Sequence, residues 1–481
     1  MGRSFEMSLW GGRFNSGPND SLIQLSKSVH FDWRLAPYEI EVNLAHLKNL
    51  ENLSIISKGD GSKIRQALTD LAKEIGSGKF TFNSTDEDVH SAIERGLIEK
   101  CGPIGGAIRA GRSRNDLVVT DFKLYLIDHL LEIATAVTNL VIVLNIKAEE
   151  NLKVVSPGFT HTQHAQPVTF AQELSKHSQA LLRDIARIFD WLNRNSKSPF
   201  GAGALAGTSL VPQPEKIASE LGFSSAMENS IDAVSDRDFV AEALFVFAML
   251  GVHLSRIGEE FILWSSSEFK WVELSDQYTT GSSIMPQKKN ADIAELARGK
   301  SGRFIGNLTS LLVVLKALPF GYNRDLQEDK EPIFDSVDQL LILLPAVTGM
   351  VESSRFNSDQ ISKTVLDDFT LATEIADYLA KKQVPFSQAH EAAGACVKLC
   401  EKLGVTLNEL SDDQLSTIHP LLTSDLRLNL TINAAITSRS STLGTAPSSV
   451  AAAISKMGKE INEIVSLISE HRKRFSGMIS L

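Results

Sequence analysis

The sequence predicts a mainly helical protein whose centre is a bundle of long helices. Two observations favour this fold class: two long segments contain neither glycine nor proline, and several long segments are strongly apolar. A third is that no short β-branched runs alternate with them, so a doubly wound parallel sheet is not expected. At 481 residues the chain is too long for one small hydrophobic core, and two or three sub-structures are expected.

The first long helix is expected over residues 117–151, which lack glycine and proline. A surface helix needs only one apolar face, but this segment is apolar almost all round. Its clearest polar residues are spaced to form one narrow stripe: Asp128, Glu132, Thr135 and Asn139. We therefore expect the helix to be covered on most sides.

Residues 168–195 also lack glycine and proline, and three further segments repeat the pattern of long apolar helices: 239–267, 305–318 and 337–351. Residues 168–195 begin behind Pro167, at a position that suits the first turn of a helix. Pro345 is expected to kink or end the last one. Long apolar helices in an acidic chain predict a bundle whose outer faces are covered by other subunits, hence a homo-oligomer.

Two polar, turn-rich segments, 105–115 and 367–373, are the expected boundaries of the bundle. They divide the chain into a mostly helical N-terminal domain (1–115), the central bundle (116–368) and a small helical C-terminal domain (369–481). In the last of these, glycine and proline separate shorter helices.

The composition argues against several classes of function. A formal net charge of −10 disfavours a nucleic-acid partner, because such binding needs clustered positive charge. Cys396 and Cys400 lack a neighbouring His or third Cys that would complete a metal site. Residues 1–15 have no apolar core of a signal peptide, and the longest apolar stretches are short or interrupted. We expect a soluble cytoplasmic protein without a membrane span.

The segment most informative about chemistry is residues 279–290, which read TTGSSIMPQKKN. Glycine, two serines and a proline oppose a helix, so this is a predicted loop, mobile around Gly281. It offers hydroxyls, backbone N–H groups and two cations ahead of a helix-favouring stretch, where an anion is stabilised. An ordinary polar loop is the alternative, but the whole string is much rarer than an isolated Gly-Ser-Ser.

A second segment, residues 160–167, reads THTQHAQP and precedes a long helix. His161 and His164 could suggest a metal, but no nearby carboxylate or thiol completes a ligand set. A histidine that titrates as a general acid or base is the more economical interpretation.

Two more polar strings precede helices, GRSRND at 111–116 and YNRDLQEDKE at 322–331. The two guanidinium groups of the first suit a dicarboxylate substrate, although a capped helix start is an alternative. The glycine-rich segment 201–207 is not preceded by a strand, so a nucleotide-binding role is not expected.

Together these strings resemble the fumarase/aspartase superfamily, whose signature is a Gly-Ser-Ser-x-Met-Pro-x-Lys-x-Asn loop. Within it the resemblance is to argininosuccinate lyases and the related δ-crystallins, because Gln287 and Lys289 stand where fumarases and aspartases typically carry Gly and Val. The resemblance covers nearly the full chain and extends to these segments: 9–14, 111–116, 322–331, 372–394 and 438–447.

The resemblance implies a three-domain helical subunit, a homotetramer, and active sites each assembled from three subunits. It implies reversible elimination of argininosuccinate to arginine and fumarate, in arginine biosynthesis, with no cofactor and no metal. Its catalytic positions fall on Ser282, His161, Glu295 and Lys288. Its substrate-binding positions fall on Ser28, Asn115, Thr160, Asn290, Tyr322, Gln327 and Lys330. The chain departs from the family at Arg109, Leu117, Ala291 and Leu443, none of which carries a chemical role.

The chemistry requires a base for a weakly acidic C–H, an anion-stabilising site and an acid for the leaving nitrogen. Ser282 is the expected base and must be activated by positive potential, for which Lys288 and loop N–H groups are available. His161, oriented by Glu295, is then the expected acid, although the two roles could be reversed. Adenylosuccinate lyase, aspartase and a catalytically silent structural homologue remain rival interpretations.

Overall fold

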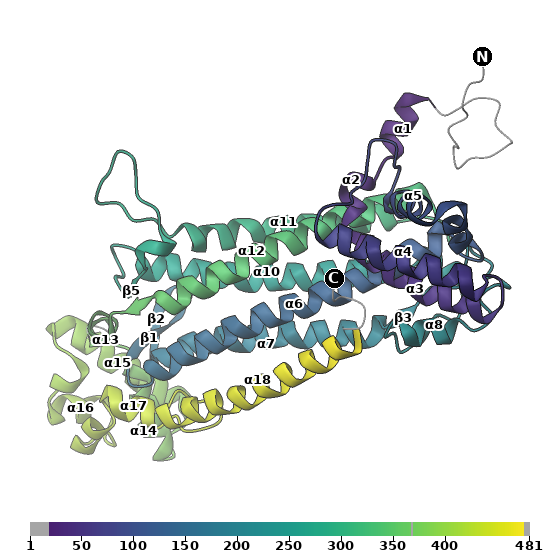
Figure 1. The fold of residues 1–481 in the computed structure, drawn as a ribbon. Coiled ribbons are helices and arrows are strands. Elements are labelled where there is room, and N and C mark those ends of the chain that lie inside the picture. Colours follow the sequence, from purple (N-terminus) through teal and green to yellow (C-terminus); the bar gives the residue numbers. More distant parts are fainter. Residues whose placement is uncertain (1–18, 367–368, 476–481) are drawn as a thin grey trace.

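The computed structural model describes residues 19–366 and 369–475. In these residues the mainly helical fold class is confirmed (Figure 1). The strands pair into three two-stranded sheets. The motif at residues 9–14 and two residues of the expected boundary at 367–373 lie outside the described parts.

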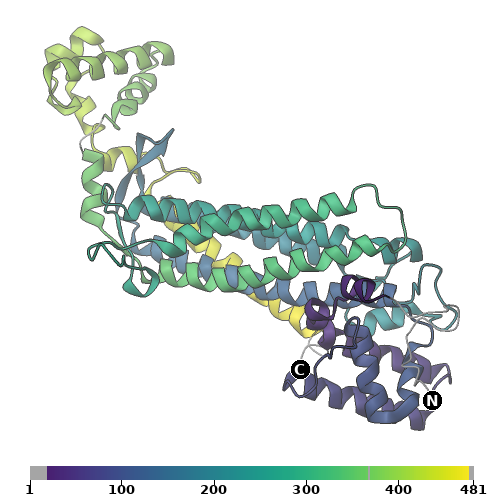
Figure 2. The ribbon, with the colours of Figure 1, turned by 90° about the horizontal axis from the view of Figure 1, so that it is seen from above.

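Long helices lie side by side along the length of the molecule and form the central bundle (Figures 1 and 2): α6 (Arg114–Glu150), α7 (Phe170–Asn195), α10 (Asp238–Ser265), α11 (Asp292–Leu315) and α12 (Lys330–Ser353). Each corresponds to a predicted segment. Helix α11 begins well before the predicted start at residue 305. Of the two outcomes expected at Pro345, an end of the helix is not observed, because buried Leu344 and Val347 hold α12 in the core on either side of it.

Helix α6 is covered on most sides, as expected. Its polar stripe is the side that remains accessible, since Glu132 and Asn139 are exposed and Asp128 and Thr135 are half-buried. The hydroxyl of Tyr38 donates a hydrogen bond to Asp128 at 2.8 Å.

The N-terminal domain packs on one end of the bundle (Figure 1). Its larger helices are α3, α4 and α5, and α3 also contacts α6. Its elements are α1 (Asp20–Ser26), α2 (Val29–Asp32), η1 (Trp33–Leu35), α3 (Ala36–Asn52), α4 (Lys58–Gly76), α5 (Val89–Cys101) and η2 (Gly102–Arg109).

Short elements connect the bundle helices. At the end opposite the N-terminal domain lies a hairpin of β1 and β2 (Figure 1). The connecting elements are β1 (Val155–Thr160), β2 (Gln163–Thr169), β3 (Lys197–Ser198), α8 (Pro214–Glu220), β4 (Ser225–Ala226), α9 (Ser230–Ser235), β5 (Val272–Glu273), η3 (Asp276–Tyr278), η4 (Arg324–Asp329), β6 (Arg355–Phe356) and α13 (Ser358–Leu366).

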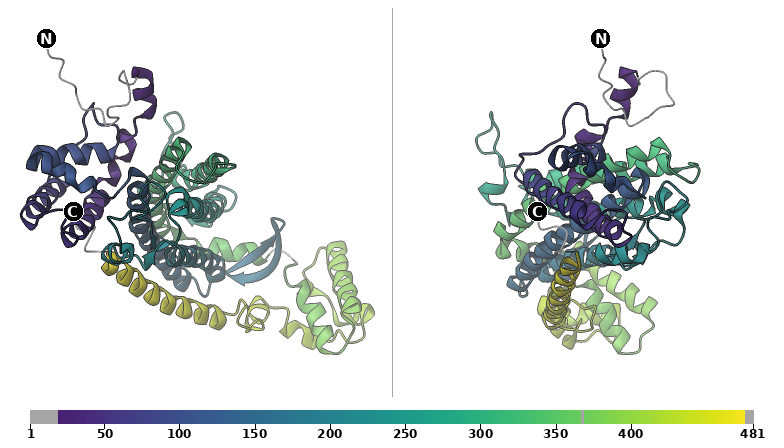
Figure 3. Two further views of the ribbon diagram at one scale, coloured as in Figure 1. Left: turned by 90° about the vertical axis from the view of Figure 1, so that its right-hand side faces the viewer. Right: turned by 45° about the vertical axis from the view of Figure 1, so that its right-hand side comes forward.

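The predicted C-terminal part, 369–481, divides in two. Its first elements have a hydrophobic core of their own and stand apart from the bundle (Figure 3). The last helix, α18 (Pro447–Phe475), instead runs back along α6 and α7 and belongs to the bundle core. The separate elements are α14 (Ala372–Lys381), α15 (Phe386–Leu403), η5 (Leu407–Glu409), α16 (Asp412–Ile418), η6 (Ser424–Leu428) and α17 (Ile432–Thr437).

Three helical stretches could cross a membrane by length and composition alone: Arg114–Glu150, Asp238–Ser265 and Arg324–Ser353. The expectation that no stretch has this character was wrong, because the isolated polar residues do not offset the leucine, isoleucine and valine around them. Between 50% and 61% of their most apolar windows is buried inside the protein. Helices α10, α11 and α12 carry exposed apolar side chains, here called the apolar outer face: Phe245, Leu263, Leu296, Ile305, Leu312, Val313 and Ile342.

Candidate active site

A cavity of about 250 Å³, here called the binding cavity, lies where the N-terminal domain meets the bundle. It brings together residues from segments far apart in the sequence. The loop before α2, the first turn of α6, and the region of η4 and α12 all contribute. Five predicted substrate-binding residues line it: Ser28, Asn115, Tyr322, Gln327 and Lys330.

Ser28 precedes α2, and its hydroxyl donates a hydrogen bond to Asp32 at 2.6 Å. The second carboxylate oxygen of Asp32 accepts the backbone N–H of Val89 at 3.0 Å, which ties α2 to the start of α5. Burial raises the pKa of Asp32 to about 6. The position of Ser28 therefore depends on a carboxyl group that belongs to the N-terminal domain.

Asn115 lies in the first turn of α6, where Ser113 and Asp116 form a capping box. The other carboxylate oxygen of Asp116 accepts the backbone N–H groups of Gly201 and Gly203 at 3.0 and 2.9 Å. Both glycines have positive φ values, 103° and 59°. The glycine-rich segment thus folds around the start of α6.

Tyr322 and Lys330 flank the short helix η4 at the entrance to α12. The ammonium group of Lys330 donates to Asp329 at 2.8 Å, and its side chain is 6% exposed. Tyr322 is half-buried, and burial raises the pKa of its hydroxyl, which stays protonated at neutral pH. The segment therefore supplies a hydroxyl donor and two cations, Lys330 and Arg324, and Arg324 forms an ion pair with Glu87 at 3.1 Å.

The two guanidinium groups that the sequence assigned to a dicarboxylate are already paired with protein carboxylates. Arg114 lies 2.6 Å from Asp88 and 3.2 Å from Glu87. Arg112 points instead toward Glu39, at 3.7 Å, and is almost fully buried. Sequence reasoning missed the acidic residues 87 and 88, although Asp88 caps α5 in a capping box, which is a recognisable signal.

Behind the cavity three buried groups, Glu39, His90 and Asp121, lie close enough to hold a metal ion. The sequence search for ligand clusters did not find them, because they come from three different helices. His90 Nδ1 is 2.9 Å from Glu39. Burial alone would lower the pKa of His90, but the Glu39 carboxylate outweighs it and raises the pKa. Burial and the neighbouring Glu39 carboxylate raise the pKa of Asp121, and Arg112 adds positive charge beside Glu39.

Thr160 and His161 lie at the tip of the β1–β2 hairpin, which the sequence did not predict. His161 and Thr162 form its two-residue turn with φ values of 54° and 60°, the combination found in type I′ turns. Such φ values are unusual for these residue types and occur often at functional sites. In the described residues His161 has no side-chain hydrogen bond, and Glu295 makes no ion pair with it.

Residues 281–289 form an exposed loop, as predicted, closed at its neck by a β-bridge between Thr280 and Asn290 (Figure 1). The hydroxyl of Thr280 donates to Asp292 at 2.7 Å, which anchors the neck to the start of α11. Ser282 Oγ accepts the backbone N–H groups of Ile284 and Met285 at 3.3 and 3.1 Å. The loop therefore surrounds this oxygen with donors.

The predicted site residues thus form two groups at opposite ends of one bundle (Figure 1). The hairpin tip, the loop and Glu295 lie at the β-strand end, and the binding cavity lies at the N-terminal-domain end. Each α-helix residue adds 1.5 Å, so a helix as long as α6 separates the groups by tens of ångströms. One chain therefore does not bring the two groups into contact.

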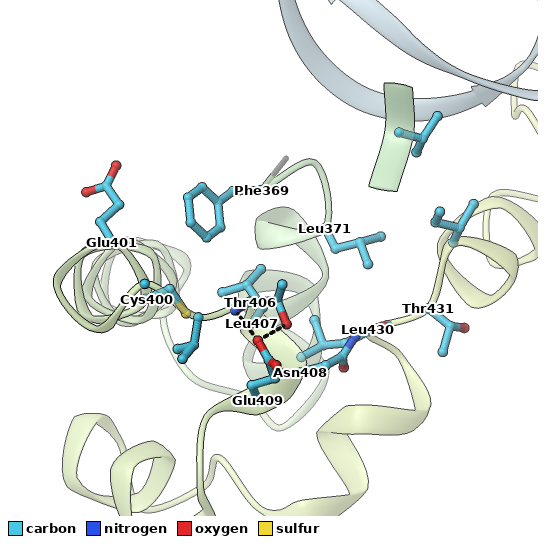
Figure 4. A pocket seen from close by; sticks show the side chains of 14 residues that line it. Phe369, Leu371, Cys400, Glu401, Thr406, Leu407, Asn408, Glu409, Leu430 and Thr431 are labelled. Atoms are coloured by element: carbon cyan, nitrogen blue, oxygen red, sulfur yellow. Dashed lines mark hydrogen bonds between the residues drawn. The ribbon is translucent and has the colours of Figure 1, made fainter. Parts of the chain in front are cut away.

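A larger cavity, about 680 Å³, lies elsewhere (Figure 4). It lies beside the connection to the C-terminal domain, with Phe369, Leu371 and Leu407 in its wall. Glu409 is engaged by the backbone N–H and hydroxyl of Thr406, at 2.7 and 2.9 Å. Its lining includes none of the predicted site residues.

Known proteins are similar to this chain in sequence. Residues 12–306 match the family described as Lyase, and residues 369–437 match the one described as Argininosuccinate lyase C-terminal. The chain is 53% identical to the argininosuccinate lyase of Frankia casuarinae, over 92% of this chain and 96% of that one. It is 51% identical to that of Mycolicibacterium paratuberculosis, over 98% and 99%. The chain belongs to the argininosuccinate lyase family.

Solved structures share the fold of this member of the argininosuccinate lyase family. EDDS lyase in complex with formate has a TM-score of 0.82 at 25% identity, covering 95% of this chain and 92% of that one. A class II fumarase from Schistosoma mansoni has a TM-score of 0.71 at 17% identity, covering 86% and 90%. The recognised family, the fold and the class of carbon–nitrogen lyase are confirmed.

Proposed function

We propose that this chain cleaves argininosuccinate to L-arginine and fumarate in the cytoplasm, by acid–base catalysis at sites shared between subunits of a homotetramer. Identity above 50% to argininosuccinate lyases over most of the chain carries the choice of reaction. The binding cavity supports it, because its lining carries both signs of charge, Lys330 and Arg324 together with Glu87 and Asp88, which suits a zwitterionic substrate. The test is fumarate release from argininosuccinate, with adenylosuccinate and aspartate as competing substrates.

In this proposal Ser282 removes the proton beside the carboxylate of the succinyl group. The two N–H groups that already point at Ser282 Oγ stabilise negative charge on it. Lys288 and Asn290 of the same loop bind the substrate as the loop closes. Closure also excludes water from the developing dianion.

His161 protonates the leaving nitrogen, and Glu295 and Thr160 complete this part of the site. The exposed hairpin tip supports this role, because its two-residue turn presents His161 outward from the bundle. Glu295, in the first turn of α11, is also exposed. Both side chains are accessible to another subunit. Exchange of the roles of Ser282 and His161 remains the alternative mechanism.

The site requires several subunits, because its two groups of residues lie at opposite ends of each bundle. Bundles packed side by side in opposite directions bring the loop and hairpin of some chains to the binding cavity of another. The apolar outer face supplies the surface for this packing, and its exposed side chains include Phe245 and Ile342, which are 48% and 66% exposed. Burying such side chains drives association.

We expect the protein to be a tetramer in solution at micromolar concentration. Replacing Leu312 and Val313 on the apolar outer face by glutamate is expected to produce smaller species and to reduce activity in parallel, because charges in an apolar interface are costly. Light scattering coupled to size exclusion measures the mass. A monodisperse monomer of the unmodified chain, active at the same concentration, contradicts the proposed assembly.

We expect full activity in metal-free buffer that contains a chelator, because the proposed steps use only side chains and backbone N–H groups. Fumarate absorbance measures the rate before and after prolonged chelation. The buried group of Glu39, His90 and Asp121 is the place where a metal could act. Loss of activity in chelator, restored by a divalent ion, contradicts the metal-free mechanism.

A further inference from the structure

A buried chain of charges lies behind the binding cavity. Arg237 precedes α10 and forms an ion pair with Asp329, which also contacts the ammonium group of Lys330 at 2.8 Å. The side chains of Arg237 and Asp329 are 1% and 0% exposed. One carboxylate oxygen faces each cation, Oδ2 toward Arg237 and Oδ1 toward Lys330. Asp329 is therefore shared between two positive groups.

Because Asp329 is shared between Arg237 and Lys330, these three groups together present a net positive charge beside the cavity. With Arg237 in place, two cations face one carboxylate, and one positive charge remains to attract a substrate carboxylate. Without Arg237, Asp329 would pair with Lys330 alone, and the net charge of the group would be zero. In a buried site such a difference matters, because solvent screens it weakly.

Arg237 is itself held firmly. Its guanidinium group donates to the backbone carbonyl of Asp236 at 2.7 Å, and that of Val234 lies at 3.5 Å. These contacts hold the guanidinium group of Arg237 against the end of α9 and keep it directed at Asp329. The positive charge of Arg237 also acts against the rise in the pKa of Tyr322, which places both in the same electrostatic environment.

We infer that Arg237 is a positioning residue for substrate binding, which holds Asp329 so that Lys330 keeps its charge available for a substrate carboxylate. The inference rests on the proposed function, in which Lys330 binds argininosuccinate. Arg237 does not line the binding cavity and does not touch substrate. It acts through Asp329 and Lys330.

The alternative is a purely structural role, in which the Arg237–Asp329 pair only stabilises the fold. A buried ion pair is weak evidence for a function, and removal of one partner destabilises a protein in either case. The two interpretations differ in what happens when both charges are removed. Removing both restores one net positive charge at Lys330 but does not restore the ion pair.

The test compares Arg237→Met with the double variant Arg237→Met/Asp329→Asn. We expect Arg237→Met to raise KM about tenfold to a hundredfold, the usual range for a lost charged hydrogen bond, with kcat changed little. The double variant is expected to return KM to within about threefold of the parent, because the Asp329 carboxylate is gone and no longer neutralises the charge of Lys330. Calorimetric binding of argininosuccinate in a Ser282→Ala background checks that KM reflects affinity.

Lys123→Met is the matched control. Lys123 is also a buried cation, 2% exposed and 3.5 Å from Asp236, but it does not line the binding cavity. The Lys123→Met variant should have a lower melting temperature than the parent and an unchanged KM. Lys330→Met should raise KM at least as much as Arg237→Met does.

The outcomes separate the inference from the proposed function. If Lys330→Met leaves KM unchanged, the assignment of Lys330 to substrate binding is wrong, and the inference falls with it. If Lys330→Met raises KM but Arg237→Met leaves it unchanged, the inference alone is overturned. A double variant that folds but binds as poorly as Arg237→Met also overturns it, in favour of a structural role.

Discussion

Replacing Ser282 by alanine is expected to reduce the turnover of argininosuccinate about 10²–10⁴-fold, the range for a lost positioned acid or base. The upper end is expected, because the C–H group that loses its proton is only weakly acidic. Substrate affinity should change little, since the binding cavity with Asn115 and Lys330 is untouched. Fumarate absorbance measures turnover, and calorimetry measures binding.

Ser283→Ala is the matched control, because Ser283 lies in the same loop, is exposed and carries the same hydroxyl. If Ser282 only fits the space available in the loop, alanine should be tolerated at both positions and a bulkier residue at position 282 should not. Turnover of Ser282→Ala within about tenfold of the parent is too small a loss for a missing base. In that case His161 becomes the leading candidate for proton abstraction.

Mixing two inactive chains is expected to restore activity when their defects lie at opposite ends of the bundle. Ser282→Ala damages the loop, and Asn115→Leu damages the binding cavity. In each parent tetramer every site combines one intact part, either the loop or the binding cavity, with one mutated part. Mixed tetramers contain some sites in which both the loop and the cavity are intact. Co-refolding the two variants and measuring fumarate release tests this result.

The control pair places both defects in the binding cavity, for example Asn115→Leu with Lys330→Met. Both residues then come from one chain, so mixing leaves every cavity with one defect, and no recovery is expected. Native mass spectrometry of tagged chains establishes that mixed tetramers have formed. Mixed tetramers of Ser282→Ala with Asn115→Leu that stay inactive contradict sites shared between subunits. The same experiment with Ser282→Ala and His161→Asn shows whether loop and hairpin come from different chains.

The sequence predicts the bundle well, because long apolar segments of helix-favouring residues must be buried against one another. The polar stripe of α6 even identifies its accessible side, from Asp128 to Asn139. The limits of the prediction are local and physical. Pro345 is tolerated within α12 because buried neighbours on both sides outweigh one lost backbone hydrogen bond. A long apolar core overrides the preference of a single residue.

The hairpin at residues 155–169 was not predicted, because its turn lacks the usual sequence signal. Two-residue turns of this type normally carry asparagine and glycine, whereas this one carries His161 and Thr162. The complete binding cavity could not be predicted from the sequence either. Five of its residues could be named from the family resemblance, but their neighbours Glu87 and Asp88 and the Arg237–Asp329 pair meet only through tertiary packing.

The return of α18 to the bundle has a consequence for how the subunit is made. The chain leaves the bundle after α13, builds a separate C-terminal domain, and comes back to pack along α6. The hydrogen bond between Arg472 and Thr135 joins residues 337 positions apart. Contacts of such sequence separation form late, because a long loop must close before they can stabilise anything. During synthesis the side of α6 that packs against α18 therefore stays uncovered until nearly the whole chain has emerged from the ribosome.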